Sequence, residues 1–87
     1  MSEPLTAMLP VNKFKRFDVR GLLRKGVEAF PEIRQRVDTL KADEGLIIVA
    51  PFLPSPLIEK LSSEGFASKV ERGSGADWIV YFWREAG

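Results

Sequence analysis

The feature that most constrains the fold is an uninterrupted apolar run, Leu46-Ile47-Ile48-Val49-Ala50, with β-branched residues at its centre. Such a run is typical of a β-strand that is buried on both faces, because a half-exposed strand alternates apolar and polar residues. We therefore expect a strand at residues 46–50 with both faces covered. The chain has 87 residues, which is enough for one small hydrophobic core but not for two.

Before this run, the sequence predicts one strand and one helix. Residues 13–19 are expected to form a strand whose core-facing side carries Phe17 and Val19, with Lys15 on the same side near its start. Residues 20–26 are expected to form a polar connection. A helix is expected at residues 30–41, since apolar residues recur there at the spacing of one helical face. These residues are Phe30, Ile33, Val37 and Leu40.

After the run, a bend at residues 51–54 leads to a helix with Ser55 as its N-cap and Pro56 as its first residue. Gly65 ends this helix, and strands at 66–72 and 77–84 flank a turn at residues 73–76. The predicted fold is an α+β two-layer β-α-β-α-β-β sandwich, in which two helices cover one face of a four-stranded mixed sheet. Residues 1–12 form a tail, and residues 13–87 form the single domain.

Composition excludes several kinds of chemistry. The chain contains neither cysteine nor histidine, which removes disulfides, thiolate and imidazole nucleophiles, and zinc sites of the usual kind. We therefore expect a protein that is not an enzyme and that needs no metal or other cofactor. The longest uncharged run, residues 45–58, is too short for a bilayer span, and the start of the chain lacks a secretory signal pattern. These features favour a cytoplasmic protein without a membrane partner.

The charges are balanced overall, with 13 basic and 12 acidic side chains and a net charge of +1, but they are unevenly distributed. Residues 13–25 contain six basic side chains and a single acidic one, Asp18. We expect Arg20, Arg24 and Lys25, just before the helix at 30–41, to bind an anionic small molecule or an acidic partner protein. The alternative is that these side chains are solvated or pair with nearby carboxylates. Asp18 and Arg20 are interpreted as a structural ion pair that fixes the turn after the first strand.

The last predicted strand carries large side chains on both faces. If both helices cover one face, Ile79, Tyr81 and Trp83 point to the other face. Four interpretations stay open: the apolar residues of the tail (Leu5, Met8, Leu9 and Val11) cover them, a second copy covers them in a homodimer, they form an apolar groove, or they are simply exposed, as single apolar side chains often are. Residues 13–17 also interleave basic and aromatic side chains, as single-stranded nucleic-acid surfaces do. A net charge of +1 makes RNA binding the least favoured alternative.

Several short motifs carry a resemblance to a known family. They are Phe17-Asp18-Val19-Arg20, Leu23-Arg24, Gly26, Ala50-Pro51-Phe52, Pro54, Pro56-Leu57, Gly65-Phe66 and Asp77-Trp78. In this order and spacing they resemble an uncharacterised bacterial family, domain of unknown function 2249, which is related to the TusA/SirA-like sulfur-carrier fold. The resemblance covers residues 14–84 and implies the same two-layer sandwich.

The resemblance also defines what this chain lacks. The TusA relatives carry a Cys-Pro pair where their first helix begins, and that cysteine accepts a persulfide sulfur. The corresponding stretch here, residues 23–30, has no cysteine, so sulfur transfer through the chain's own thiol is excluded. The chain also departs from the closer family at Leu53, where an acidic residue is expected, and at Ala29, where a proline is expected.

These observations favour a non-enzymatic binding or adaptor module that uses Arg20, Arg24 and Lys25. One alternative is a homo-oligomeric interaction protein that uses Ile79, Tyr81 and Trp83. The other is an accessory factor in sulfur or redox metabolism that acts through partners.

Overall fold

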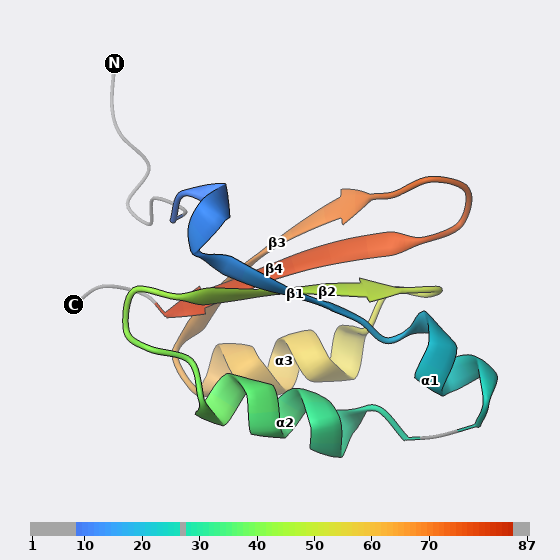
Figure 1. Cartoon of the computed structure of the whole chain (residues 1–87), viewed down its shortest axis with the longest axis horizontal. Coiled ribbons are helices and arrows are strands. Elements are labelled where there is room, and N and C mark those ends of the chain that lie inside the picture. The colour runs from blue at the N-terminus through green and yellow to red at the C-terminus, as the bar shows by residue number, and fades with distance from the viewer. Residues whose placement is uncertain (1–8, 27, 85–87) are drawn as a thin grey trace.

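The computed structural model describes residues 9–26 and 28–84 of the chain (Figure 1). Its elements follow the predicted order, with a short helix added at each side of the first strand. They are η1 (Val11–Lys13), β1 (Phe14–Asp18), α1 (Arg20–Arg24), α2 (Phe30–Asp38), β2 (Gly45–Ala50), α3 (Ser55–Ser63), β3 (Phe66–Arg72) and β4 (Trp78–Arg84). The expected α+β fold is confirmed.

The four strands form one mixed sheet in the order β1-β2-β4-β3. β1 and β2 are parallel, while β4 is antiparallel to both of its neighbours, β2 and β3. Helices α2 and α3 lie side by side beneath one face of this sheet, and η1 lies on the other side (Figure 1). The predicted layer of two helices is therefore present, and β1 and β3 are the edge strands.

The connection predicted at residues 20–26 is wrong, because it contains the helix α1. Leu22 and Leu23 are partly buried against the core, and the Leu23 amide donates a 3.0 Å hydrogen bond to the Val19 carbonyl. Packing of two adjacent leucines therefore gives this charged segment a helical turn. Gly26, with a φ of +78°, follows the helix in a left-handed conformation that glycine adopts without strain.

Smaller differences concern where the predicted helices begin and end. α2 ends at Asp38 rather than at residue 41, since the Thr39 hydroxyl donates to the Arg36 carbonyl at 2.9 Å and closes the last turn. Leu40 is nevertheless buried, as its apolar spacing predicts. Ser55 is the first residue of α3 rather than its cap. No helix within residues 9–26 and 28–84 has both the length and the apolar character needed to cross a bilayer.

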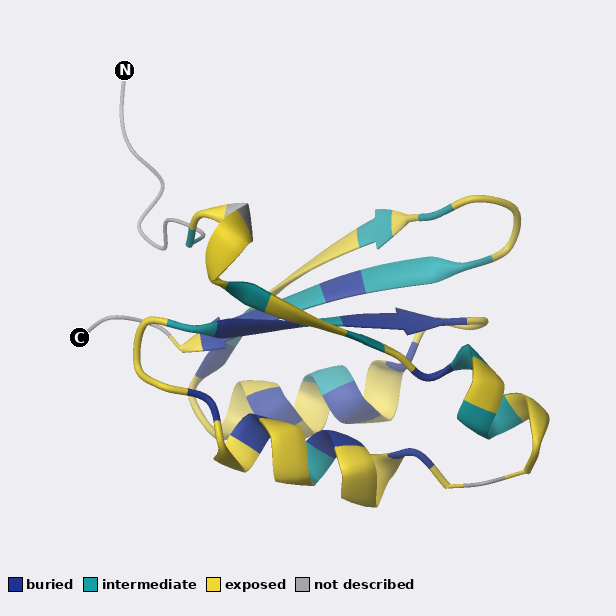
Figure 2. Cartoon of the chain, viewed as in Figure 1, coloured by how far each residue is buried: buried dark blue, intermediate teal, exposed yellow. Residues whose placement is uncertain are grey.

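The main core lies between the sheet and helices α2 and α3 (Figure 2). Apart from Val19, its largest fully buried side chains come from the two central strands and the facing helices. They are Val37, Leu46, Ile48, Leu61, Val80 and Phe82. Val49, which points to the opposite face, is only 3% exposed. The predicted burial of this strand on both faces is thus confirmed, with only Ile47 partly exposed.

The face of the sheet opposite the helices carries an aromatic cluster. The Phe14 ring stands edge-on to Tyr81 at 5.5 Å and to Trp83 at 6.2 Å between ring centroids. Trp83 is buried, and Tyr81 and Ile79 are half-buried. β1 therefore covers part of the aromatic side of β4 by itself. Of the tail residues predicted to cover this face, Leu5 and Met8 lie outside the described residues.

Gly45 makes this cluster possible, because Phe14 lies opposite it in the register of β1 and β2. A Cβ atom at position 45 would come within 2.4 Å of the Phe14 ring and within 2.7 Å of the Phe82 carbonyl oxygen. Neither a ring packed between two aromatic residues nor a strand carbonyl can move away easily. The absence of a side chain at this position therefore allows Phe14 to lie across the sheet.

We predict that Gly45→Ala lowers the free energy of unfolding by about 1–3 kcal/mol, the usual cost of overpacking a core. Chemical denaturation measures this loss. Gly21→Ala is the matched control, because a Cβ there meets nothing within 4 Å and alanine favours a helix over glycine. The control variant should be as stable as the natural chain or slightly more so. Equal stability of the two variants would contradict the proposed role of Gly45.

Candidate functional site

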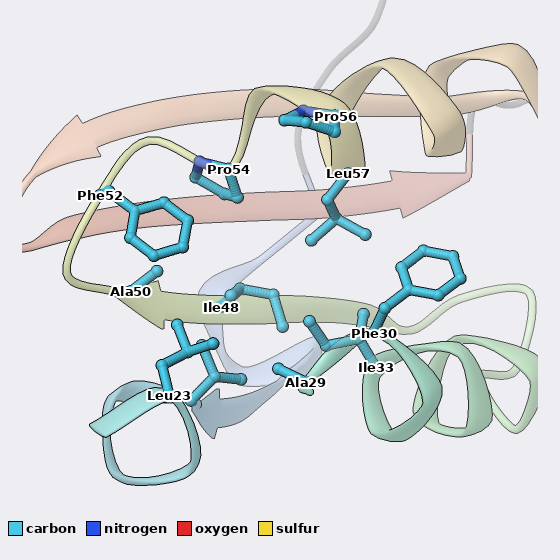
Figure 3. Close-up of a pocket in the computed structure, with 11 residues that line it drawn as sticks. Leu23, Ala29, Phe30, Ile33, Ile48, Ala50, Phe52, Pro54, Pro56 and Leu57 are labelled. Atoms are coloured by element: carbon cyan, nitrogen blue, oxygen red, sulfur yellow. The ribbon is translucent and has the colours of Figure 1, made fainter. Parts of the chain in front are cut away.

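An apolar pocket of about 220 Å³ lies where β2 ends, between α1, the start of α2 and the start of α3 (Figure 3). Ile48 and Ala50 of β2 form its floor. Three segments that are distant in the sequence form its walls, each with carbon-rich side chains directed toward the same space. The walls include Leu23 of α1, Phe30 of α2 and Phe52 of the bend before α3.

Large apolar side chains remain exposed around this pocket. Phe52 is 53% exposed and Phe30 is 38% exposed, and both line it. Leu53, beside Phe52, is 39% exposed. Among residues 9–26 and 28–84, only one further large apolar side chain, Val70, is comparably exposed. Exposed apolar side chains that gather around a concave apolar surface are a common mark of a binding site.

The bend between β2 and α3 explains why Phe52 is exposed. Pro54 is buried and fixes the end of the bend, and the Ser55 amide donates to the Leu53 carbonyl at 2.9 Å. The prolines at positions 51 and 54 leave the intervening residues little conformational freedom. Phe52 and Leu53 are therefore held at the surface instead of folding back into the core.

Arg20 connects three parts of the chain next to the pocket. Its Nε donates to both carboxylate oxygens of Asp18, at 2.9 and 3.1 Å, and one of its terminal nitrogens donates to Asp77, which directly precedes β4. The Asp18 carboxylate also accepts a 3.0 Å hydrogen bond from the Arg20 amide. The predicted structural ion pair between Asp18 and Arg20 is confirmed, and Asp77 is a second partner that the sequence did not indicate.

These contacts shift the protonation equilibria of both groups. Hydrogen bonds from the Arg20 side chain lower the pKa of Asp18 to about 2, and the same bonds raise the pKa of Arg20. Asp18 is therefore ionised at neutral pH and Arg20 is charged. Since two carboxylates neutralise one guanidinium, Arg20 is a weaker candidate for binding an external anion than the sequence suggested.

A wider depression of about 520 Å³ adjoins the apolar pocket and shares Leu23 and Phe52 with it. Arg20, Arg24 and Asp77 also line this depression. The structure thus brings two of the three predicted anion-binding residues together. Lys25 is exposed at the end of α1 and does not line the depression. Within the described residues no ion pair involves Arg24, so Arg24 contributes the positive charge beside the pocket.

The predicted interface residues lie elsewhere. Ile79, Tyr81 and Trp83 are on the sheet face opposite the helices, whereas the pocket is on the helix side. None of the pocket-lining side chains is titratable. In the part of the chain that the structure describes, no cluster of three carboxylates is arranged to hold a metal ion. The pocket can therefore bind an apolar group, and Arg24 can attract an anionic one.

Comparison with known proteins agrees with the motif resemblance. A profile of the family described as "Uncharacterized conserved protein (DUF2249)" matches residues 16–84, which is most of the chain. The chain therefore belongs to this family. No curated protein and no solved structure matches it. The relation to the TusA/SirA-like fold stays a prediction, as does the bacterial origin.

Sequence reasoning identified the charged border of this site but not the pocket itself. A signal for the pocket was present in Pro51-Phe52-Leu53-Pro54, where two large apolar side chains stand in a bend between prolines. Apolar residues in a rigid loop have no element that would carry them into the core. The other lining residues resemble ordinary core positions in sequence, and only the arrangement of the three walls makes them part of a pocket.

We predict that Asp18→Asn weakens the acid sensitivity of the protein. Because folding lowers the pKa of Asp18 from 3.8 to about 2, its contribution is present above pH 4 and is lost as the pH falls toward 2. Its side chain is 39% exposed, so solvent screening limits this contribution to about 1 kcal/mol. Urea denaturation at pH values between 2 and 6 measures it.

Glu59→Gln, which removes a carboxylate from the exposed surface of α3, is the control. The natural chain and the control should lose more stability between pH 4 and pH 2 than Asp18→Asn loses. Parallel curves for all three proteins would contradict this role of Asp18.

Proposed function

We propose that this protein is a non-catalytic adaptor that binds a partner protein by enclosing one of the partner's apolar side chains in the pocket beside Phe52. The observation that carries this proposal is the presence of two exposed aromatic side chains, Phe30 and Phe52, in the lining of an apolar cavity. Leaving such side chains in water costs free energy that a bound apolar group would recover.

The size of the pocket favours a side chain over a complete small molecule. Small-molecule sites usually enclose about 300–1,000 Å³, and this pocket has about 220 Å³. A cavity of roughly 150 Å³ holds a benzene ring, so an aromatic or large aliphatic side chain fits. We therefore propose that the partner inserts one anchor residue of this kind.

The adjoining depression supports an acidic neighbour for that anchor. Arg24 borders the depression, and Leu23 and Phe52 line both the depression and the pocket. A partner segment that places its anchor in the pocket would pass its next residues over Arg24. A carboxylate there would form a charge-assisted hydrogen bond with the guanidinium. The absence of cysteine and histidine supports a binding role over a catalytic one.

A displayed library of random peptides tests this function. We expect recovered peptides to share an aromatic or large aliphatic residue close to an aspartate or glutamate. Phe52→Ala should weaken binding of a recovered peptide about tenfold, because it removes a wall of the pocket at a central contact. Fluorescence anisotropy with the labelled peptide measures the change.

Leu53→Ala is the matched control, since Leu53 is exposed next to Phe52 but does not line the pocket. Arg24→Ala should weaken the binding of acidic peptides several-fold and leave the binding of analogues with amides in place of the carboxylates unchanged. Equal losses for Phe52→Ala and Leu53→Ala would overturn the pocket as the site. Recovery of no peptides, together with saturable binding of phenylacetate observed by NMR, would assign the pocket to small molecules and overturn the adaptor role.

A further inference from the structure

The outer edge of β3 is the second surface whose chemistry points to a partner. β3 (Phe66–Arg72) ends the sheet, and within residues 9–26 and 28–84 no strand pairs with its far side. β3 is mostly exposed (Figure 2). Among its residues only Phe66 is buried, and Val70 is 40% exposed. An edge of this length offers a row of backbone groups to another strand, and natural proteins usually protect such edges.

The register of the β3–β4 hairpin shows which backbone groups face outward. The Gly73 amide donates to the Asp77 carbonyl at 2.9 Å, so this opposed pair is a hydrogen-bonded one. In an antiparallel ladder, hydrogen-bonded and non-hydrogen-bonded pairs alternate. Lys69 and Glu71 therefore direct their amides and carbonyls toward β4. Ser68, Val70 and Arg72 direct theirs to the free edge.

This edge is complementary to a second copy of itself. When two β3 strands are placed antiparallel with Val70 opposite Val70, the outward-facing backbone groups of both copies meet in hydrogen-bonded pairs. In the same register, Lys69 of each copy lies opposite Glu71 of the other. These two residues form a non-hydrogen-bonded pair, in which cross-strand side chains approach most closely.

Neighbouring registers are less favourable. If Val70 of one copy lies opposite Ser68 of the other, the outward-facing backbone groups still meet, but Lys69 lies opposite Lys69. If Val70 lies opposite Arg72, Glu71 lies opposite Glu71. Like charges directly opposite each other destabilise a sheet. A register centred on Ser68 leaves Lys69 opposite Ala67, without an opposite charge. Only the register centred on Val70 therefore combines two attractive charge pairs with contact between the exposed valines.

Contacts within each copy already hold the charged groups in position. The Lys69 Nζ lies 3.2 Å from the Glu71 carboxylate, and the Tyr81 hydroxyl donates to Glu71 at 3.1 Å. Glu71 is thus held on the side of the sheet where the second copy would present Lys69. Less side-chain freedom is lost on association when a group is already positioned.

We propose that the protein forms a two-fold symmetric homodimer in which the β3 edges pair antiparallel around Val70 and join the two sheets into one. The two-fold axis of this dimer lies between the two Val70 residues, so each copy contributes the same strand edge to the interface. This surface differs from the aromatic face of β4 and leaves the pocket beside Phe52 free. The proposal is independent of the adaptor function.

Engineered cysteines test the register directly, since the natural chain has none. In the proposed dimer the Cα atoms at position 70 of the two copies are about 5.5 Å apart, within the range that a disulfide spans. At position 68 they are offset by four residues, or roughly 13 Å. We expect Val70→Cys to form a disulfide-linked dimer on mild oxidation and Ser68→Cys to remain unlinked. Equal cross-linking of both variants would overturn the register.

Charge exchange tests the dimer in solution by sedimentation equilibrium over a wide concentration range. Lys69→Glu should raise the dissociation constant about tenfold or more, because two attractive pairs become repulsive. Combining it with Glu71→Lys should restore the natural value. Lys41→Glu, which makes the same charge change outside β3, should have no effect, and thermal unfolding of each variant checks that it is folded. A natural chain that remains monomeric at its highest soluble concentration would overturn the proposal.

Discussion

Burial of β2 on both faces is the constraint on which the rest of this structure depends. On one side, Leu46 and Ile48 pack against α2 and α3. On the other side, the Phe14 ring of the neighbouring strand lies across Gly45 and meets the aromatic rings of β4. The sheet therefore needs a helical layer on only one face, because an aromatic side chain from its own edge covers part of the other. In a chain of 87 residues this arrangement limits the number of elements that the core requires.

The same strand positions the candidate site. β2 ends at Ala50, and the chain then turns through a proline-bounded bend that keeps Phe52 at the surface. α2 and α3 both begin close to this end of the sheet, so their first turns supply two walls of the pocket. Arg20, which forms ion pairs with Asp18 and Asp77, lies in α1, the helix that supplies the third wall. The pocket therefore forms at the end of β2, where the buried strand reaches the surface. The ion pairs of Arg20 with Asp18 and Asp77 lie beside it.

Local patterns allowed much of the fold to be predicted from the sequence. Helical spacing identified the two helices that pack beneath the sheet, while an uninterrupted apolar run identified β2, and alternation and turn signals identified the other three strands. α1 was missed, since its helical turn depends on Leu22 and Leu23 contacting a distant core. The pocket was missed for a related reason: its walls come from three separate segments, and no local pattern records their meeting. The hydrogen bond from Arg20 to Asp77 was missed as well, because it joins two residues that are 57 positions apart in the chain.

The hydrogen bond between Arg20 and Asp77 links two distant parts of the chain. One end of this link lies in the first third of the chain, and the other is contributed by the residue that directly precedes the last strand. Because this link and the packing of Leu23 both hold α1 at the sheet, the Leu23 wall of the pocket depends on residues from both the first and the last part of the fold. A change at the start of β4 can therefore alter the shape of a pocket whose lining residues do not include any residue of β4.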